Sequence, residues 1–310
     1  ASSYSPKKMD SYSSDKKIIK QHLKSWANLK DSQITFERLP SLSNLIWKVT
    51  ALSDKTRPKA IIYRKFADDN NFVDRATENY IYDELSKSKL GPRCLGYSST
   101  FRIEEYYDCD PVDRNDIRTP KIRRIFARNL AALHSLSLPN MDKRPCFLRN
   151  LTEGIYFKEV NKKRLLTEFS DSELSIISEI ECTLFLKEEI DFLLSILPKN
   201  PACVTFSHND LHAGNILHLK NTSDYLFIDC EYSGYNYRAF DIANLFAETV
   251  FDYHYSEYPY YKVEEEAYPP QSELKDFIRY YAFFKMFRAD LTEVESKSII
   301  DDPKAMKQYL

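Results

Sequence analysis

The fold of this chain is decided by residues 206–232, which read FSHNDLHAGNILHLKNTSDYLFIDCEY. Polar turns separate three short apolar runs in or beside this stretch, at 204–206, 216–219 and 226–228. Short apolar runs bounded by turn-forming residues are typical of β-strands. The pattern therefore predicts a short β-hairpin flanked by two turns. The first turn carries Asp210 and Asn215, and Asp229 ends the third strand.

These three side chains are the groups that phosphoryl transfer from ATP needs on a kinase-like scaffold. One carboxylate serves the acceptor hydroxyl, whereas an amide oxygen and a second carboxylate hold magnesium. Mg²⁺ prefers oxygen ligands and takes few of them from the protein, because the phosphates supply the rest. Asp210, Asn215 or Asp229 alone would be interpreted as a turn-forming side chain. The whole pattern, with strands on both sides, favours the phosphotransferase interpretation.

Composition limits the classes of partner that this chain can have. Its 310 residues are enough for two lobes. The formal net charge is −2 and the pI about 6.4, so no basic excess favours nucleic acid or a membrane surface. No apolar stretch is long enough to span a bilayer, so we expect no stable membrane insertion. The five glycines are too widely spaced for a GxGxxG fingerprint or a GxxxxGK[ST] loop.

The cysteines and the N-terminal segment both favour a cytoplasmic protein. The six cysteines are scattered without close pairs, which indicates reduced thiols rather than a zinc site or a disulfide framework. Residues 1–17 are rich in Ser, Lys and Tyr and have no apolar core, so they are not a secretory signal. We expect them to be a disordered lead-in to a helix that begins near Ile18.

Residues 18–107 are predicted to form a small, β-rich lobe that binds ATP. Its strands are expected in three β-branched and aromatic runs, at 45–51, 59–66 and 102–107. Asp74 is a suitable N-cap for a helix whose apolar residues recur at helical spacing as far as Lys89. Residues 108–118 are polar and charged, and we expect them to be the connection between lobes.

Residues 119–310 are predicted to form a larger, mainly helical lobe that carries the catalytic hairpin and the substrate pocket. Thr119 and Pro120 form a good N-cap and first helical position. Further helices are predicted at about 172–197, 240–251 and 271–287. The expected fold class is α+β, with two lobes arranged as in protein kinases.

Two motifs resemble those of the choline/ethanolamine kinase family. Residues 207–215 read SHNDLHAGN, similar to the family's HNDxxxxN motif. Residues 228–248 match a long and specific second signature, IDxEYxxYNxxxFDxxNxFxE. The likeness extends more weakly from the strands near Leu45 to the helix near Phe287. It implies an ATP- and Mg²⁺-dependent transfer of the γ-phosphoryl group to choline, which is the first step of the CDP-choline route to phosphatidylcholine.

The resemblance assigns roles to the hairpin residues. It implies that Asp210 is the catalytic base, or orients the acceptor hydroxyl. It implies that Asn215 and Asp229 hold magnesium, and that Glu231 reaches a second metal ion or its waters. Asp241 is expected to bond the backbone of the catalytic loop or Arg238.

The resemblance also assigns ATP binding to residues of the β-rich lobe: Ser43, Asn44, Arg64, Glu105 and Tyr107. Ser43 and Asn44 resemble the end of the family's phosphate loop, although residues 39–44 contain no glycine. Arg64 is expected to meet the ATP phosphates, and Glu78 to brace Arg64. Residues 105–107 are expected to be the hinge that gives backbone hydrogen bonds to adenine.

Choline is a quaternary ammonium ion, which is best recognised by aromatic faces and a nearby carboxylate. Tyr232, Glu248 and Tyr253 lie where the family places such groups, and Asp210 is the fourth substrate-binding residue that we expect. No insertion separates Glu248 from Tyr253, which resembles the choline branch of the family rather than the ethanolamine branch. The family normally continues with a tryptophan-bearing helix that closes the choline site. Here the two tryptophans are Trp26 and Trp47, so either that wall is absent from this sequence or another element replaces it.

Several alternatives to choline kinase remain. The nearest is ethanolamine kinase. A phosphotransferase for another small alcohol, such as an aminoglycoside, fits the long second signature less well. A non-catalytic, pseudokinase-like module is a further alternative, although Asp210, Asn215 and Asp229 are all intact. ATP and choline or ethanolamine are therefore the expected ligands, nucleic acid is not, and a homodimer is left open.

Overall fold

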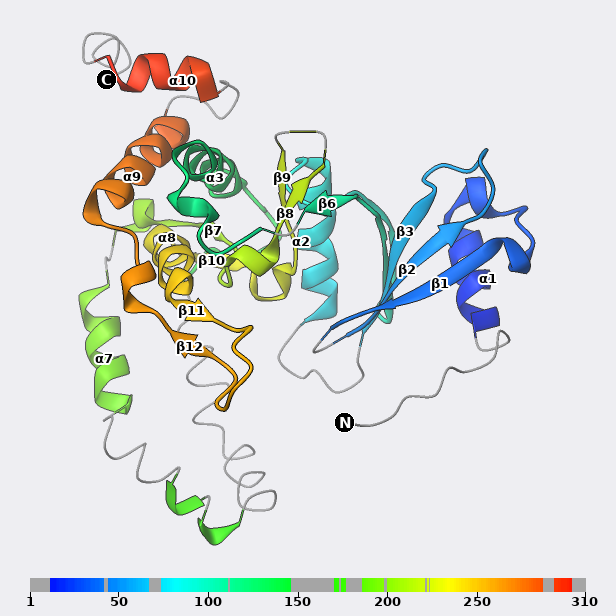
Figure 1. Ribbon diagram of the computed structural model, residues 1–310, viewed down its shortest axis with the longest axis horizontal. Helices are drawn as coiled ribbons and strands as arrows, with labels where there is room; N and C mark the ends of the chain where they lie inside the picture. The colour runs from blue at the N-terminus through cyan, green and yellow to red at the C-terminus, as the bar shows by residue number, and fades with distance from the viewer. Residues whose placement is uncertain are drawn as a thin grey trace. The chain divides into compact units, whose positions relative to one another are not determined.

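The computed structural model describes a folded chain that divides into two compact units (Figure 1). The described residues are 12–41, 44–66, 74–110, 112–145, 170–172, 174–176, 186–197, 200–220, 222, 224–286 and 293–302. Unit 1 comprises Ala1–Asp113 and Gly214–Glu231, and unit 2 comprises Arg114–Ala213 and Tyr232–Leu310. No described helix is both long and apolar enough to cross a membrane.

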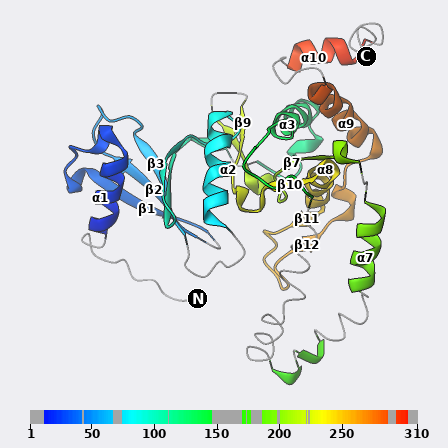
Figure 2. The ribbon, with the colours of Figure 1, turned by 180° about the vertical axis from the view of Figure 1, so that it is seen from behind.

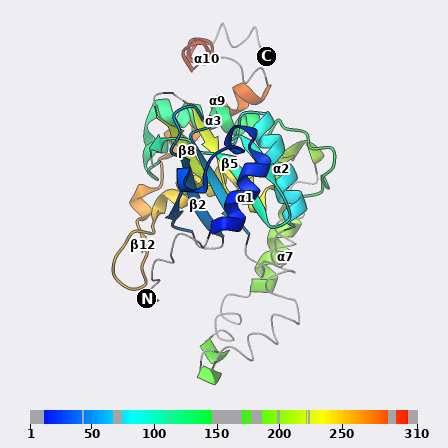
Figure 3. The same ribbon diagram turned by 90° about the vertical axis from the view of Figure 1, so that its right-hand side faces the viewer.

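Unit 1 contains a five-stranded antiparallel sheet with the strand order β1-β2-β3-β5-β4. The strands are β1 (Ile34–Leu39), β2 (Leu45–Ala51), β3 (Ala60–Lys65), β4 (Cys94–Tyr97) and β5 (Phe101–Glu105). The three strands predicted from the sequence correspond to β2, β3 and β5, whereas β1 and β4 were not predicted. Figure 3 shows helix α1 (Ser13–His22) lying across this sheet.

Helix α1 begins at Ser13 and not near Ile18, so the expectation that residues 13–17 are a disordered lead-in is wrong. The reason is a buried polar contact with the sheet. Asp15 is buried, accepts a hydrogen bond from Tyr63 Oη at 3.2 Å and pairs with Lys65 Nζ at 3.0 Å. These contacts stabilise the first turn of the helix, which composition alone does not reveal. Residues 1–11 lie outside the described part of the chain.

The two faces of the sheet differ because successive side chains of a strand point to opposite sides. One face packs on α1 in an apolar core that includes Ile19, Trp26, Trp47, Val49, Ile61, Tyr63 and Ile103. The other face carries buried charged residues, and helix α2 (Arg75–Lys87) lies on that side (Figures 1 and 2). The predicted N-cap of α2 is confirmed, because the Asp74 carboxylate accepts a hydrogen bond from the Ala76 N–H at 3.1 Å.

The predicted hairpin is confirmed and belongs to unit 1. It consists of β8 (Ile216–Leu219) and β9 (Tyr225–Phe227), which pair antiparallel. Strand β6 (Cys109–Asp110), from the predicted connection, completes a sheet of order β6-β8-β9. The strand before the hairpin, β7 (Val204–Ser207), instead pairs with β10 (Gly234–Tyr237) in unit 2.

Unit 2 is mainly helical. Its described helices are α3 (Pro120–Leu133), α7 (Leu186–Ile196), α8 (Arg238–Ala247), α9 (Gln271–Met286) and α10 (Glu293–Ile300). Figures 1 and 2 both show α3 and α9 side by side. Helix α8 ends at Ala247, earlier than predicted, and is followed by a 3₁₀ turn (Glu248–Val250). Phe251 then begins β11 (Phe251–Asp252), which pairs with β12 (Lys262–Val263). The α+β fold class, with a β-rich part followed by a helical part, is confirmed.

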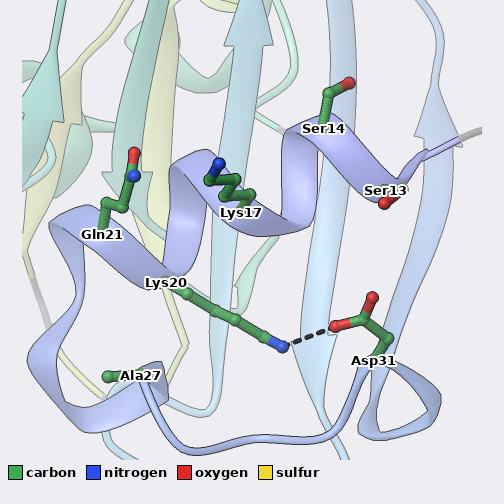
Figure 4. Close-up of a pocket in the computed structure, with 7 residues that line it drawn as sticks. All are labelled: Ser13, Ser14, Lys17, Lys20, Gln21, Ala27 and Asp31. Atoms are coloured by element: carbon green, nitrogen blue, oxygen red, sulfur yellow. Dashed lines mark hydrogen bonds and ion pairs between the residues drawn. The ribbon is translucent and has the colours of Figure 1, made fainter.

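A pocket on the outside of α1 contains none of the predicted site residues (Figure 4). Its lining includes Lys17 and Gln21 of α1, and Lys20 Nζ lies 2.5 Å from Asp31 Oδ1. The lining side chains are exposed or half-buried. This pocket is therefore not the predicted phosphotransferase site.

Candidate active site

The loop after β7 carries Asp210, and its backbone is held in an unusual conformation. Asn209 has a φ of 68°, in the left-handed region that is uncommon for residues other than glycine. Its side-chain amide donates to the Tyr232 carbonyl at 2.9 Å, and its Oδ1 accepts from Asn236 Nδ2 at 2.8 Å. Strain of this kind persists only where the surroundings hold it, and it is concentrated at functional sites. The residue before Asp210 is therefore fixed by its own side chain.

Asp241 of α8 holds the same loop through hydrogen bonds to its backbone. It is fully buried, and its two carboxylate oxygens accept hydrogen bonds from the backbone N–H groups of His208 at 2.7 Å and Asn209 at 2.8 Å. Burial would raise the pKa of Asp241, but the hydrogen bonds that it accepts from His134 and from the His208 N–H outweigh burial, so the pKa lies below the ordinary value. The prediction that Asp241 bonds the loop backbone is confirmed.

A hydrogen-bonded chain extends from Asp241 into the packing between α3 and α9. His134 Nε2 lies 3.0 Å from Asp241 Oδ2, and His134 Nδ1 lies 2.7 Å from Tyr281 Oη. His134 is buried, and burial lowers its pKa below the ordinary value even though Asp241 favours the charged form. A neutral His134 that donates to Asp241 and accepts from Tyr281 satisfies all these groups. The loop is thus tied to two helices.

The buried His134 predicts that acid lowers the stability of the fold. Since its pKa is lower in the folded chain than the ordinary value of 6.5, the unfolded chain binds more protons below that pH. The free energy of unfolding should therefore fall as the pH decreases through about 6.5. Urea unfolding at several pH values between about 7.5 and 5.5 measures this dependence. His134→Gln keeps one donor and one acceptor without titrating, so its dependence should be shallower. Equal slopes would contradict the prediction.

The predicted acceptor-binding residues are brought together in unit 2. Tyr253 Oη donates to Glu248 Oε2 at 3.0 Å, and the Tyr253 ring stacks on Phe251 with centroids 5.9 Å apart. Burial, the hydrogen bond to Glu248 and the charges of Glu248 and Asp210 together raise the pKa of Tyr253 to about 12. Glu248 and Tyr253 are therefore joined by a hydrogen bond, and the charge of Asp210 also acts on Tyr253. The Tyr232 side chain is 42% exposed, and its carbonyl accepts the Asn209 amide.

The predicted metal ligands lie on the turns at the two ends of the β8–β9 hairpin in unit 1. The Asn215 carbonyl accepts a hydrogen bond from the Ile228 N–H at 3.0 Å, which holds Asn215 beside the residue that precedes Asp229. Asp229 has a φ of 57°, again left-handed. Glu231 follows in a 3₁₀ turn, and burial, then the charges of Asp229 and Glu78, raise its pKa. Amide and carboxylate oxygens on adjacent turns fit a hard cation such as Mg²⁺.

The predicted pairing between Glu78 and Arg64 is wrong. Glu78 instead lies 2.9 Å from Arg102 Nη1 and 2.6 Å from Arg75 Nη1. Arg64 pairs with Glu104, Nε to Oε1 at 3.6 Å, and with Asp229, Nη1 to Oδ1 at 3.4 Å. The reason is the register of the sheet, in which Arg64 of β3 lies directly opposite Arg102 of β5, and Arg102 takes the helix carboxylate.

The remaining predicted ATP-binding residues have different surroundings. Asn44 is buried, and its N–H donates to Ser41 Oγ at 3.3 Å, whereas Ser43 lies outside the described residues. The Glu105 N–H already donates to the Arg93 carbonyl at 2.9 Å, so that donor is engaged within the sheet. Tyr107 follows the end of β5, and its Oη donates to Glu105 Oε2 at 3.4 Å.

Comparison with known proteins identifies the family. The model of the family described as "Choline/ethanolamine kinase" matches residues 7–307. The chain belongs to the choline/ethanolamine kinase family. A relative from Rattus norvegicus named "Choline/ethanolamine kinase" is 30% identical over 275 residues, which cover 86% of this chain and 65% of the relative. The chain thus spans less than two thirds of that relative's length.

Solved structures show the same fold. A choline kinase from Cryptosporidium parvum has a TM-score of 0.73 at 23% identity, covering 95% of this chain and 85% of that one. A Plasmodium vivax ethanolamine kinase has a TM-score of 0.69 at 20% identity, covering 97% of this chain and 79% of that one. At these identities the likeness establishes the fold and does not distinguish the two activities.

Several residues whose hydrogen bonds or ion pairs hold the candidate site in place were not predicted from the sequence. They are Arg75, Arg102, Glu104, His134, Asn209 and Tyr281. One signal was present, because Arg102 and Glu104 alternate with the apolar Phe101 and Ile103 along β5. Alternation of this kind ordinarily indicates a face open to solvent. Here the face carrying Arg102 is buried under α2, which only the tertiary structure shows.

Proposed function

We propose that this chain catalyses the transfer of the γ-phosphoryl group of ATP to the hydroxyl of choline. The observation that carries the proposal is a set of side chains in unit 2: Glu248 and Tyr253, which share a hydrogen bond of 3.0 Å, and Asp210, whose charge acts on Tyr253. It combines a carboxylate on a rigid loop with a second carboxylate and an aromatic face. This is the chemistry that recognises a quaternary ammonium alcohol and activates its hydroxyl.

Asp210 supports the proposal as the group that receives the proton of the acceptor hydroxyl. General bases act within hydrogen-bond reach of the proton they abstract, so their position has to be fixed. The neighbouring residue Asn209 donates its N–H to Asp241 and accepts a hydrogen bond from Asn236, and these bonds provide such a fixed position. His212 Nε2 lies 3.8 Å from Asp210 Oδ2.

Unit 1 supplies the residues proposed for ATP and magnesium. Asn215 and Asp229 would hold Mg²⁺, with Glu231 reaching a second ion or its waters. When bound, magnesium neutralises the charge that develops on the phosphoryl group. Arg64 would bind the phosphates, together with Ser43 and Asn44 of the preceding loop. Glu105 and Tyr107 would bind adenine; since the Glu105 N–H is engaged, backbone donation falls to Tyr107.

Ethanolamine is the second candidate acceptor, because the family includes kinases for both alcohols. The two differ in hydrogen bonding, since the ethanolammonium group has three N–H donors and choline has none. Choline therefore depends on aromatic faces and on charge. Tyr253 is 60% exposed and Tyr232 42% exposed, so their rings are accessible to such a ligand. The free thiols of Cys94, Cys109, Cys203 and Cys230 fit a cytoplasmic location, as the proposal requires.

Replacing Tyr253 tests the choice between the two alcohols. If its ring faces the trimethylammonium group, Tyr253→Ala should lower kcat/KM for choline several-fold more than for ethanolamine. A cation over an aromatic face gains about 0.5–2 kcal/mol, and ethanolamine recovers part of that through its N–H donors. Tyr253→Phe is the matched control, because it keeps the ring and loses only the bond to Glu248. Its ratio of the two kcat/KM values should stay near that of the wild type.

Equal losses for choline and ethanolamine in the Tyr253→Ala enzyme would show that this ring only packs on Phe251. Glu248→Gln should weaken both substrates, since each carries one positive charge. A Glu248→Gln enzyme that discriminates between them would assign selectivity to the carboxylate instead of the ring.

A further inference from the structure

A chain of alternating charges in unit 1 begins at Asp229 and returns to the same turn at Glu231. We call it the charge ring, and its members in order are Asp229, Arg64, Glu104, Arg102, Glu78, Arg75 and Glu231. The successive distances between ionic atoms are 3.4, 3.6, 2.8, 2.9, 2.6 and 3.8 Å. The ring passes through β3, β5, α2 and the turn after β9. Its two ends are both residues of the candidate metal-binding turn.

Arg102 lies in the middle of the charge ring and is its most buried member, with no side-chain exposure. Its guanidinium lies over the Tyr82 ring, 3.9 Å from the centroid. Burial opposes the charged form, but the carboxylates of Glu104 and Glu78 outweigh it and raise the pKa of Arg102. A buried ion pair contributes little net free energy to folding, because desolvation offsets the attraction between the charges. Such groups are better explained by the side-chain positions that they fix.

Through two carboxylates, Arg102 fixes the positions of two other arginine side chains, Arg64 and Arg75. Its Nε holds Glu104 at 2.8 Å, and Glu104 in turn faces Arg64. Its Nη1 holds Glu78 at 2.9 Å, and Glu78 in turn holds Arg75, which also stacks over Phe66 with a distance of 4.6 Å. Arg64 and Arg75 are the cations that face the acidic residues of the candidate metal turn.

We infer that Arg102 is a positioning residue that fixes the acidic groups of the metal-binding turn through the charge ring. It touches neither Asp229 nor Glu231 in any contact of the described residues, so it acts only through its neighbours. Glu231 Oε2 is buried, and within the described part of the chain its 3.8 Å contact with Arg75 Nη1 is too long for a hydrogen bond, so this oxygen keeps the capacity to accept one from a metal-bound water. The inference rests on the proposed assignment of Asn215 and Asp229 to magnesium.

Arg102→Lys is the variant that tests the inference, because it keeps the charge and loses the planar guanidinium that spans the two carboxylates. Mn²⁺ binding is measured by electron paramagnetic resonance with a non-hydrolysable ATP analogue, after subtraction of an analogue-only titration. Residues that orient metal ligands typically change metal affinity by about 10–100-fold, so the Kd for Mn²⁺ should rise at least about tenfold. This measurement needs no acceptor, so its outcome is independent of whether choline is the substrate.

Asp15→Asn is the matched control. Asp15 is a buried acid of unit 1 that pairs with Lys65, the neighbour of Arg64 on β3, but it is outside the charge ring. A general loosening of unit 1 would raise the Kd in this variant as well. Its Kd for Mn²⁺ should instead stay within about twofold of wild type. An equal rise in Asp15→Asn and Arg102→Lys would overturn the inference.

Glu104→Gln is the second variant, for the case in which Arg102→Lys does not fold. It keeps the shape and the hydrogen-bonding capacity of Glu104 and removes only its charge. Its Kd for Mn²⁺ should also rise. In turnover the Mg²⁺ concentration for half-maximal rate should rise while KM for choline stays unchanged, and saturating Mg²⁺ should restore most of kcat. A lower melting temperature with an unchanged Kd for Mn²⁺ would reduce the ring to a structural role.

Discussion

Asp210→Asn is expected to abolish turnover while leaving ATP binding close to wild type. The Asp210 carboxylate is proposed to accept the proton of the acceptor hydroxyl, and a neutral amide is a far poorer proton acceptor. Positioned acid–base groups contribute about 10²–10⁴-fold to the rate, so the loss should be well beyond tenfold. Asp210 is not among the residues proposed to bind ATP, so nucleotide affinity should change little. Steady-state turnover and the Kd of a fluorescent ATP analogue measure the two effects.

Asp252→Asn is the control for this prediction. Asp252 lies in β11 of the same unit, and its Oδ1 accepts the His254 N–H at 2.9 Å. The same change of charge should leave its turnover near that of the wild type. An Asp210→Asn enzyme with near-wild-type turnover would remove Asp210 from the chemistry and with it the proposed mechanism.

Asp229→Ala is expected to raise the magnesium requirement and to cut turnover strongly. Losing this carboxylate removes a metal ligand and, with it, the neutralisation of charge developing on the phosphoryl group. It also removes one of the two carboxylates, Glu104 and Asp229, that pair with Arg64 within the described residues. The rate as a function of Mg²⁺ at saturating ATP measures the effect. We expect the Mg²⁺ concentration for half-maximal rate to rise at least about tenfold.

Backbone strain is a competing explanation for Asp229→Ala, since Asp229 has a left-handed φ of 57°. Asp229→Gly separates the two effects, because glycine adopts this conformation without strain but supplies no ligand. Both variants should show the same magnesium dependence. Asp224→Ala, in the same hairpin, is the control for the loss of a carboxylate. If the glycine variant regains the wild-type metal dependence, Asp229 has a backbone role and is not a ligand.

The features that the sequence predicts best are those determined by residues close together in the chain. The hairpin of β8 and β9 is confirmed because short apolar runs and polar turns determine it within a few residues of chain. The N-cap at Asp74 is confirmed for the same reason. The same local patterns placed Asp210, Asn215 and Asp229 on turns, although their chemical roles remain proposals.

The features that the sequence did not predict depend on which strand lies opposite which. Glu78 pairs with Arg102 instead of Arg64 because the register of β3 and β5 places the two arginines side by side. The start of α1 at Ser13 depends on Asp15 meeting Tyr63 across the sheet, a contact between distant parts of the chain. The connection from Asp241 through His134 is equally non-local. Buried polar contacts between distant residues leave no periodic pattern in the sequence, so they cannot be predicted from it in this way.

Identifying the product of the reaction tests directly whether this chain phosphorylates choline. The chain is incubated with ATP and Mg²⁺ together with choline, with ethanolamine or with no acceptor, and the phosphorus species are followed by ³¹P nuclear magnetic resonance. With choline, a phosphomonoester resonance of phosphocholine should grow in step with ADP, and it should be absent from the Asp210→Asn reaction. ADP that forms at the same rate without any acceptor, or no phosphomonoester with either alcohol, would contradict the proposed function.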